Sequence, residues 1–174
     1  MEDRLYKKLE AYGKSDFYPF HMPGHKRNPL AVEGDFPVER DITEIDGFDN
    51  LLHAEDILKR AQEDVARLYG VPESFYSING SSGAILAAVS AAVDKGGQIL
   101  VARNCHKAVY HAIYLRELSA TYIYPHEDPK LGINGGISPG RVEMYLAENP
   151  EIQAVLITSP TYDGIVSDVA RIAE

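Results

Sequence analysis

Short apolar runs alternate with stretches of helical periodicity through the second half of the chain, and this alternation limits the fold more than any other feature. Strands are predicted over four apolar runs, at 71–78, 98–102, 121–124 and 154–158. Helices are predicted between and after them, at 85–93, 108–118, 138–148 and from 169 onward. Strands and helices that alternate at this spacing form a parallel sheet covered by helices. We therefore predict a three-layer α/β fold with a mainly parallel sheet flanked by helices.

The first part of the chain lacks this alternation. Apolar residues at helical spacing predict a short amphipathic helix over 4–12 and a longer helix over 53–69. Between them lies an aromatic loop, 17–27, which is too rich in Pro and Gly for a helix. A loop of this kind packs onto its own domain or onto a partner. We expect residues 1–35 to form an N-terminal arm and residues 36–174 a larger domain.

The acidic balance of the chain argues against two classes of partner. A net charge of −9 disfavours nucleic acid and anionic membranes, because both attract clustered lysine and arginine. No apolar run approaches the length of a membrane span, and the charged N-terminus lacks the apolar stretch of a signal peptide. We expect a cytoplasmic protein with neither a nucleic-acid nor a membrane partner.

The cysteine content bears on redox compartment and on metals. Cys105 is the one cysteine in the sequence, so no internal disulfide can form and a reducing compartment fits. Cys105 and His106 are adjacent, so their side chains would diverge, and no second cysteine exists to complete a zinc site. We expect no bound metal.

Polar residues follow three of the predicted strands where each strand ends, at 79–82, 104–107 and 158–163. In parallel sheets, ligands bind beyond the carboxyl ends of the strands. If the strands are neighbours, these three loops line one site. Each loop alone also has an ordinary structural explanation, but their convergence at one edge favours a functional one.

The turn at 80–83 has two interpretations. A Gly/Ser turn before a helix leaves backbone N–H groups free near the positive end of the helix dipole. Ser81 and Ser82 add two hydroxyls, so the turn could hold a phosphate. It lacks the lysine of a Walker loop and the spacing of a dinucleotide-binding loop. The alternative is a plain turn in which a serine caps the helix, and the turn alone favours that alternative.

The other two loops carry an imidazole and a set of hydroxyls. His106 could stack on a flat ring or relay a proton, or it could be satisfied by local hydrogen bonds with no further role. Residues 158–164 offer hydroxyls and the carboxylate of Asp163. They could equally form an ordinary Asp-Gly turn closed by Ser and Thr.

Several motifs occur together in a fixed order. They are Phe-His-Met-Pro-Gly-His-Lys at 20–26, Asp-Ile-Thr-Glu at 41–44, Asp-Asn-Leu-Leu-His at 49–53, Ser-Ile-Asn-Gly-Ser-Ser-Gly at 77–83, Arg-Asn-Cys-His-Lys at 103–107 and Ser-Pro-Thr-Tyr-Asp-Gly at 159–164. In this order the chain resembles the bacterial-type ornithine/lysine/arginine decarboxylases, which are fold-type-I enzymes that use pyridoxal 5′-phosphate. The resemblance implies that the α/β domain is part of the large domain of that fold.

The resemblance also implies a role for each site loop. Gly80, Ser81 and Ser82 would hold the cofactor phosphate, and His106 would stack on the pyridine ring. Thr161 would approach the cofactor or the substrate. The Pro-Gly-His-Lys loop would lie near a dimer interface and the mouth of the site. The family usually has Thr before the second Ser of the turn, and Ser81 keeps the hydroxyl.

The activity implied is decarboxylation of lysine, arginine or ornithine, with release of CO2 and a polyamine-type amine, by a homodimer or higher homo-oligomer. The lysine that anchors the cofactor and the Asp that pairs with its pyridine nitrogen would lie beyond Glu174, so no catalytic residue is assigned. We expect the chain to be the N-terminal part of such an enzyme, inactive alone and with weak or no cofactor binding. The alternatives are another fold-type-I enzyme, such as an aminotransferase or lyase, and a truncated, non-catalytic binding or interaction domain.

Overall fold

The computed structural model describes residues 4–174. The chain forms two compact units that divide between Tyr76 and Ser77. Residues 36–76 therefore group with the first unit, whereas the sequence suggested a division after residue 35. The assignment of these parts as an arm and a cofactor domain stays a prediction. Within the described residues, no helix is both long and apolar enough to span a membrane.

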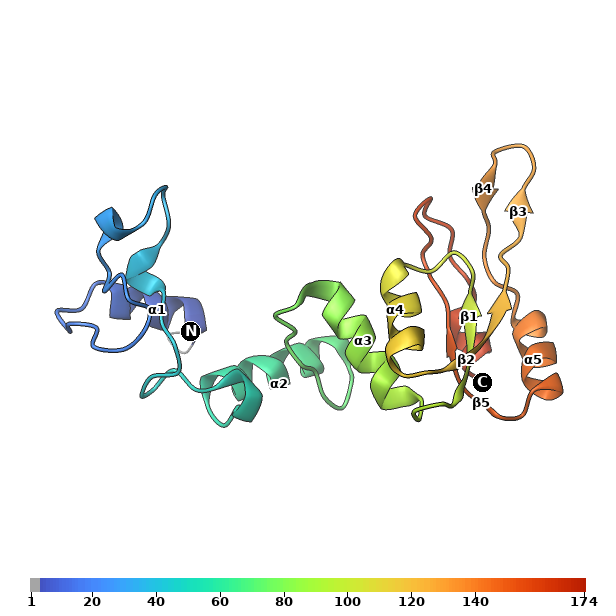
Figure 1. The fold of residues 1–174 in the computed structure, drawn as a ribbon, viewed down its shortest axis with the longest axis horizontal. Coiled ribbons are helices and arrows are strands. Elements are labelled where there is room, and N and C mark those ends of the chain that lie inside the picture. The colour runs from blue at the N-terminus through green and yellow to red at the C-terminus, as the bar shows by residue number, and fades with distance from the viewer. Residues whose placement is uncertain (1–3) are drawn as a thin grey trace. The chain divides into compact units, whose positions relative to one another are not determined.

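The first unit consists of two helices joined by irregular chain. Helices α1 (Leu5–Gly13) and α2 (Ile57–Tyr69) flank three short 3₁₀ turns, η1 (Pro29–Ala31), η2 (Val38–Arg40) and η3 (Leu51–His53) (Figure 1). The ring of Tyr12 on α1 meets the buried ring of Phe48 edge-on, with centroids 5.3 Å apart. The guanidinium of Arg27 lies 4.0 Å from the centre of the Tyr12 ring. These contacts hold the end of the aromatic loop against α1.

The second unit contains a three-stranded parallel sheet in the order β2-β1-β5. The strands are β1 (Gln98–Ala102), β2 (Ser119–Ile123) and β5 (Ile152–Leu156) (Figure 1). In the central strand, Ile99 to Ala102 are each at most 1% exposed. A strand buried on both faces is what a parallel sheet covered by helices requires. The predicted strand at 98–102 is confirmed with the same bounds.

Helices cover both faces of this sheet. On one face, α3 (Gly80–Ala92) and α4 (Lys107–Leu115) pack their apolar side chains against β1, with Val89 and Val109 in the same buried cluster. On the other face, α5 (Pro139–Glu148) and α6 (Val169–Ala173) contribute Val142 and Ile172 to a second cluster. Figure 1 shows α4 and α5 on opposite sides of the strands. The predicted three-layer α/β arrangement is confirmed.

The strand predicted over 71–78 is wrong. This segment forms no ladder within the described residues, and Phe75 is 78% exposed. The segment turns back onto α2, where the hydroxyl of Ser74 donates to the carbonyl of Gln62 at 2.6 Å. A strand needs a neighbouring strand to pair its backbone N–H and C=O groups. This apolar run has no such neighbour and is held to α2 by side-chain hydrogen bonds.

Two further differences concern the start of α3 and the segment between β2 and α5. Helix α3 begins at Gly80 and not near residue 85, so the serines belong to its first turn. The segment between β2 and α5, for which no helix or strand is predicted, contains a small antiparallel hairpin, β3 (Glu127–Asp128) and β4 (Ile133–Asn134). The carboxylate of Asp128 closes the hairpin turn by accepting the N–H groups of Leu131 and Lys130, which lowers its pKa below the usual range.

Asp49, which precedes α2 by several residues, stabilises the start of that helix. Its carboxylate accepts the N–H groups of Glu55, Asp56 and Leu58 at 2.9–3.0 Å. Asp56 holds the N-cap position of α2 but makes no side-chain cap hydrogen bond, so Asp49 replaces it. The φ of 67° at Asp49 lies in the left-handed region that Asp and Asn tolerate best after Gly. These N–H donors, that of Glu55 first, hold the pKa of Asp49 well below its usual range.

Replacing Asp49 by Asn should loosen the start of α2. The amide keeps the shape and suits the same φ, but it loses the charge and turns an N–H donor towards other donors. Amide hydrogen exchange at Leu58, measured by NMR, should quicken about tenfold. Asp46→Asn, the same change at an exposed neighbour, should have no such effect, and equal effects from both variants would contradict this role.

The first unit should also loosen in acid because of the same carboxylate. Its folded pKa is lowered, so its contribution to stability is present above the pKa of an unfolded Asp, about 4. That contribution is lost as the pH falls through the folded value. Amide shifts of Glu55 and Leu58, followed by NMR below pH 4, should report the loss. In Asp49→Asn this acid-dependent step should disappear.

Candidate functional site

Two of the predicted loops leave the sheet at one edge. In the register of the sheet, Val101 of β1 lies opposite Leu156 of β5. Both strands run in the same direction, so the segments 103–106 and 157–161 begin side by side at the carboxyl ends. This is the position at which parallel sheets bind ligands.

The packing of α3 and α4 brings the third segment to this edge. The N–H of Gly96, just after α3, donates to the carbonyl of Arg116, just after α4, at 3.0 Å. The two helices pack against each other, and their carboxyl ends meet at this bond. Their first turns therefore both face the carboxyl edge of the sheet. The first turn of α3 therefore lies at this edge although no strand forms at 71–78, because the packing of α3 against α4 places it there.

The first turn of α3 is open. Asn79 holds its N-cap position but makes no side-chain cap hydrogen bond. The N–H groups of the first turn of an α-helix have no partner within the helix, and the first intrahelical bond here is donated by Gly83 to Asn79. Ser81 and Ser82 are exposed at this point. A serine cap for α3, the alternative explanation of the turn, is therefore wrong.

Two glycines shape the same turn. Gly80 has φ +63°, in the left-handed region, and a Cβ built there meets no atom within 4 Å. The space beside the free N–H groups is thus open. A Cβ at Gly83 would lie 2.6 Å from the Cβ of Asn79, so only glycine fits there. Backbone donors with open space and adjacent hydroxyls match what a phosphate group requires.

His106 occupies the N-cap position of α4. Its Nδ1 accepts the N–H of Ala108 at 3.2 Å, and its carbonyl accepts the N–H of Val109. The residue is exposed. A local hydrogen bond therefore satisfies Nδ1 of His106, and the exposed residue lies at the carboxyl edge. A role in ring stacking or proton transfer stays a prediction.

Thr161 lies buried at the base of the loop after β5, where it is 7% exposed. Its Oγ1 accepts the N–H of Ile165 at 3.1 Å, and its carbonyl accepts the N–H of Gly164. These bonds close the Asp-Gly turn that the sequence offered as the ordinary explanation. At the tip, Tyr162 is fully exposed. A contact from Thr161 to a cofactor or substrate stays a prediction.

Arg103 and Tyr110 form a contact near His106 that sequence patterns do not predict. The guanidinium of Arg103 donates to the hydroxyl of Tyr110 and lies 5.2 Å from its ring centre. Burial, with Cys105 adjacent, raises the pKa of Tyr110, and Arg103 opposes this shift. These contacts tie the segment after β1 to α4. A strand-end Arg followed seven residues later by Tyr was the available signal, but many helices carry such a pair.

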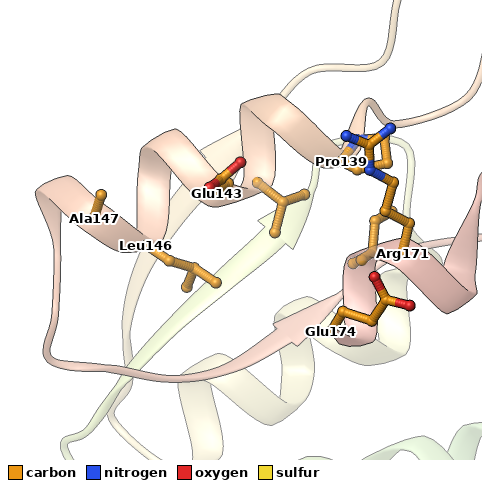
Figure 2. A pocket seen from close by; sticks show the side chains of 8 residues that line it. Pro139, Glu143, Leu146, Ala147, Arg171 and Glu174 are labelled. Carbon is orange, nitrogen blue, oxygen red and sulfur yellow. The ribbon is translucent and has the colours of Figure 1, made fainter.

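One cavity lies on the opposite face of the sheet from the predicted site residues of α3 and α4. It has a volume of about 550 Å³ and opens between α5 and α6. Figure 2 shows Glu143 and Leu146 on its α5 wall and Arg171 on its α6 wall. None of the predicted site residues lines it. Among the described residues, no cluster of His, Cys, Asp or Glu could hold a metal ion.

A family model described as Orn/Lys/Arg decarboxylase, major domain, matches residues 4–174. The chain belongs to this decarboxylase family. An arginine decarboxylase of Halalkalibacterium halodurans is 35% identical over 176 residues, a match that covers 98% of this chain and 36% of that protein. The lysine decarboxylase LdcA of Pseudomonas aeruginosa is 26% identical over 185 residues, which covers 92% of this chain and 24% of that protein.

The solved structure of lysine decarboxylase A from Pseudomonas aeruginosa matches this fold with a TM-score of 0.74. The match covers 92% of this chain and 24% of that chain, at 24% sequence identity. It confirms the α/β fold that the sequence predicted for this family. The chain spans 36% of the length of the arginine decarboxylase that it matches.

Thr161→Val should destabilise the second unit. Valine keeps the shape, but it removes the acceptor of the N–H of Ile165 at a half-buried position, a loss of about 0.5–1.5 kcal/mol. Urea denaturation should show this loss, with faster amide exchange at Ile165. Tyr162→Ala, at the exposed tip of the same loop, should leave the free energy of unfolding within about 0.5 kcal/mol. If Thr161→Val leaves both the free energy of unfolding and the amide exchange at Ile165 unchanged, Thr161 does not close this loop.

Proposed function

We propose that this chain supplies the phosphate-binding and ring-binding part of a pyridoxal 5′-phosphate site in a basic amino acid decarboxylase. One observation carries the proposal. The first turn of α3, with free N–H groups and the exposed Ser81 and Ser82, faces the same sheet edge as the exposed ring of His106. Membership of the decarboxylase family indicates which phosphate-bearing ring such a site would take.

The residues present fit this cofactor. The free N–H groups at the start of α3 and the two serine hydroxyls would bind the phosphate, favoured by the helix dipole. His106, held by α4, would orient the ring from one face. Thr161 would keep the loop after β5 in place beside it. When bound, the cofactor supplies an electron sink that stabilises the carbanion left by departing CO2.

The names of the relatives support decarboxylation and a cationic substrate. They are described as arginine and lysine decarboxylases, which favours loss of CO2 from lysine, arginine or ornithine over the transamination or other lyase reactions of related enzymes. The product would be a polyamine-type amine. The net charge of −9 suits cationic substrates. We further propose a cytoplasmic homodimer or higher homo-oligomer.

Binding of the cofactor can be tested on the 174-residue chain with pyridoxamine 5′-phosphate, which cannot form an imine with surface lysines. Amide shifts in two-dimensional NMR detect weak binding. We expect shifts at Ser81, Ser82 and Gly83 and at the segment 104–107. Pyridoxamine, which lacks the phosphate, should not produce them. Shifts confined to other parts of the unit would overturn the proposal.

Replacing both serines should weaken this binding. The double variant Ser81→Ala, Ser82→Ala loses two hydrogen bonds to a charged group, so the dissociation constant should rise at least about tenfold. Ser90→Ala is the matched control, because Ser90 lies on the same helix, exposed and far from its first turn. If Ser90→Ala weakens binding as much, the serines of the first turn are not the phosphate ligands.

Activity requires the rest of the enzyme. The 174-residue chain alone should release no CO2 from lysine, arginine or ornithine. In a chimera, this chain replaces the matching segment of the Halalkalibacterium halodurans arginine decarboxylase. The chimera should release CO2 from at least one of the three, and the two serine replacements should raise its requirement for added cofactor. A folded chimera that forms keto acids and no CO2 would contradict decarboxylation.

A further inference from the structure

We propose that the cap hydrogen bond of α4 fixes the proton of His106 on Nε2, so that this residue acts at the site as a hydrogen-bond donor through Nε2 and not as a base. The inference rests on the proposed function for its site, but the position of the proton can be tested without any ligand. Its first support is the geometry of the cap.

The cap bond determines which nitrogen is free of a proton. Nδ1 of His106 accepts the N–H of Ala108 at 3.2 Å. An imidazole nitrogen can accept only through a lone pair, so Nδ1 carries no proton while the bond is made. A neutral imidazole has one N–H, which must then be on Nε2. The second hydrogen bond of a histidine ring sets its tautomer in the same way at metal and catalytic sites.

The buried face of α4 keeps this bond in place. Ala108 and Val109 are 2% and 1% exposed, and Ala112 is 1% exposed. The helix therefore cannot shift without disturbing the sheet core. If the proton moved to Nδ1, the N–H of Ala108 would lose its acceptor. The tautomer and the ring orientation of His106 thus follow from the packing of α4 and exist before any ligand binds.

The free end of the ring then has a defined chemistry. Within residues 4–174, Nε2 of His106 has no hydrogen-bond partner, and the residue is exposed. An exposed N–H at the carboxyl edge suits an anionic oxygen, such as the carboxylate of an amino acid or the phosphate of the cofactor. It does not suit proton abstraction, since Nε2 already holds a proton in the neutral ring.

The tautomer can be read directly by NMR. In the chain with ¹⁵N-labelled histidine, long-range ¹H–¹⁵N spectra distinguish a protonated from an unprotonated ring nitrogen. His106→Asn identifies the His106 signals by their loss. We expect the neutral ring without ligand to carry its proton on Nε2, and to keep it there when pyridoxamine 5′-phosphate or lysine is added. A ring protonated on Nδ1, or an even mixture, overturns the proposal.

Two variants separate the cap from the ring. Asn is a strong N-cap residue, so His106→Asn keeps the cap and loses the ring, whereas His106→Phe keeps a flat ring and loses the cap. Amide exchange at Ala108 should stay unchanged in the Asn variant and rise about tenfold in the Phe variant. Shifts caused by pyridoxamine 5′-phosphate at 104–107 should weaken in both.

The outcomes distinguish this inference from the proposed function. If His106→Phe binds pyridoxamine 5′-phosphate as the wild type does, the cap does not position the ring and the inference fails. Faster exchange at Ala108 in His106→Asn also overturns it. If the wild type shows the Nε2 proton and the expected exchange pattern but no ligand shifts at all, the proton assignment stands and the cofactor site is wrong.

Discussion

The burial of β1 is the constraint on which the rest of the second unit depends. The residues from Ile99 to Ala102 are buried, and the strand pairs with β2 on one edge and with β5 on the other. The strand can therefore neither shift nor reverse without exposing apolar surface. The parallel partners β2 and β5 must then end at the same edge. The helices on the α3 face pack against the same side chains, and they begin at that edge for the same reason.

The two helices that begin at this edge differ in how their N-termini are capped. Helix α4 is capped by the ring of His106, so its first N–H groups are partly satisfied by the protein. The first turn of α3 is left open by Asn79, with two serines exposed beside it. A cap hydrogen bond fixes the side chain that makes it, whereas the free N–H groups at an uncapped helix N-terminus can bind an anion. A ring held by a cap hydrogen bond and an uncapped helix start at the same edge fit the flat, phosphate-bearing ligand that we propose.

The sequence predicted the part of this arrangement that depends on local patterns. The sequence predicts the strand at 98–102 with its observed bounds, because a buried parallel strand is a continuous apolar run bounded by Gly and polar residues. The strand at 71–78 was wrong because an apolar run does not reveal whether a neighbour exists, and this one bonds to α2 through Ser74. The cap by His106 and the loop closure by Thr161 depend on the direction of their side chains. The spacing of residues in the sequence does not reveal that direction. The position of Ser81 and Ser82 before a helix, together with the family motif, predicts them as phosphate ligands.

The central claim is that the open first turn of α3 is an anion site beside His106, and a crystal structure of the chain with pyridoxamine 5′-phosphate tests it most directly. The account predicts the phosphate against the backbone N–H groups and hydroxyls of Ser81 and Ser82, with the ring next to His106. A phosphate held by Arg171 in the cavity between α5 and α6, with the first turn of α3 empty, would contradict it.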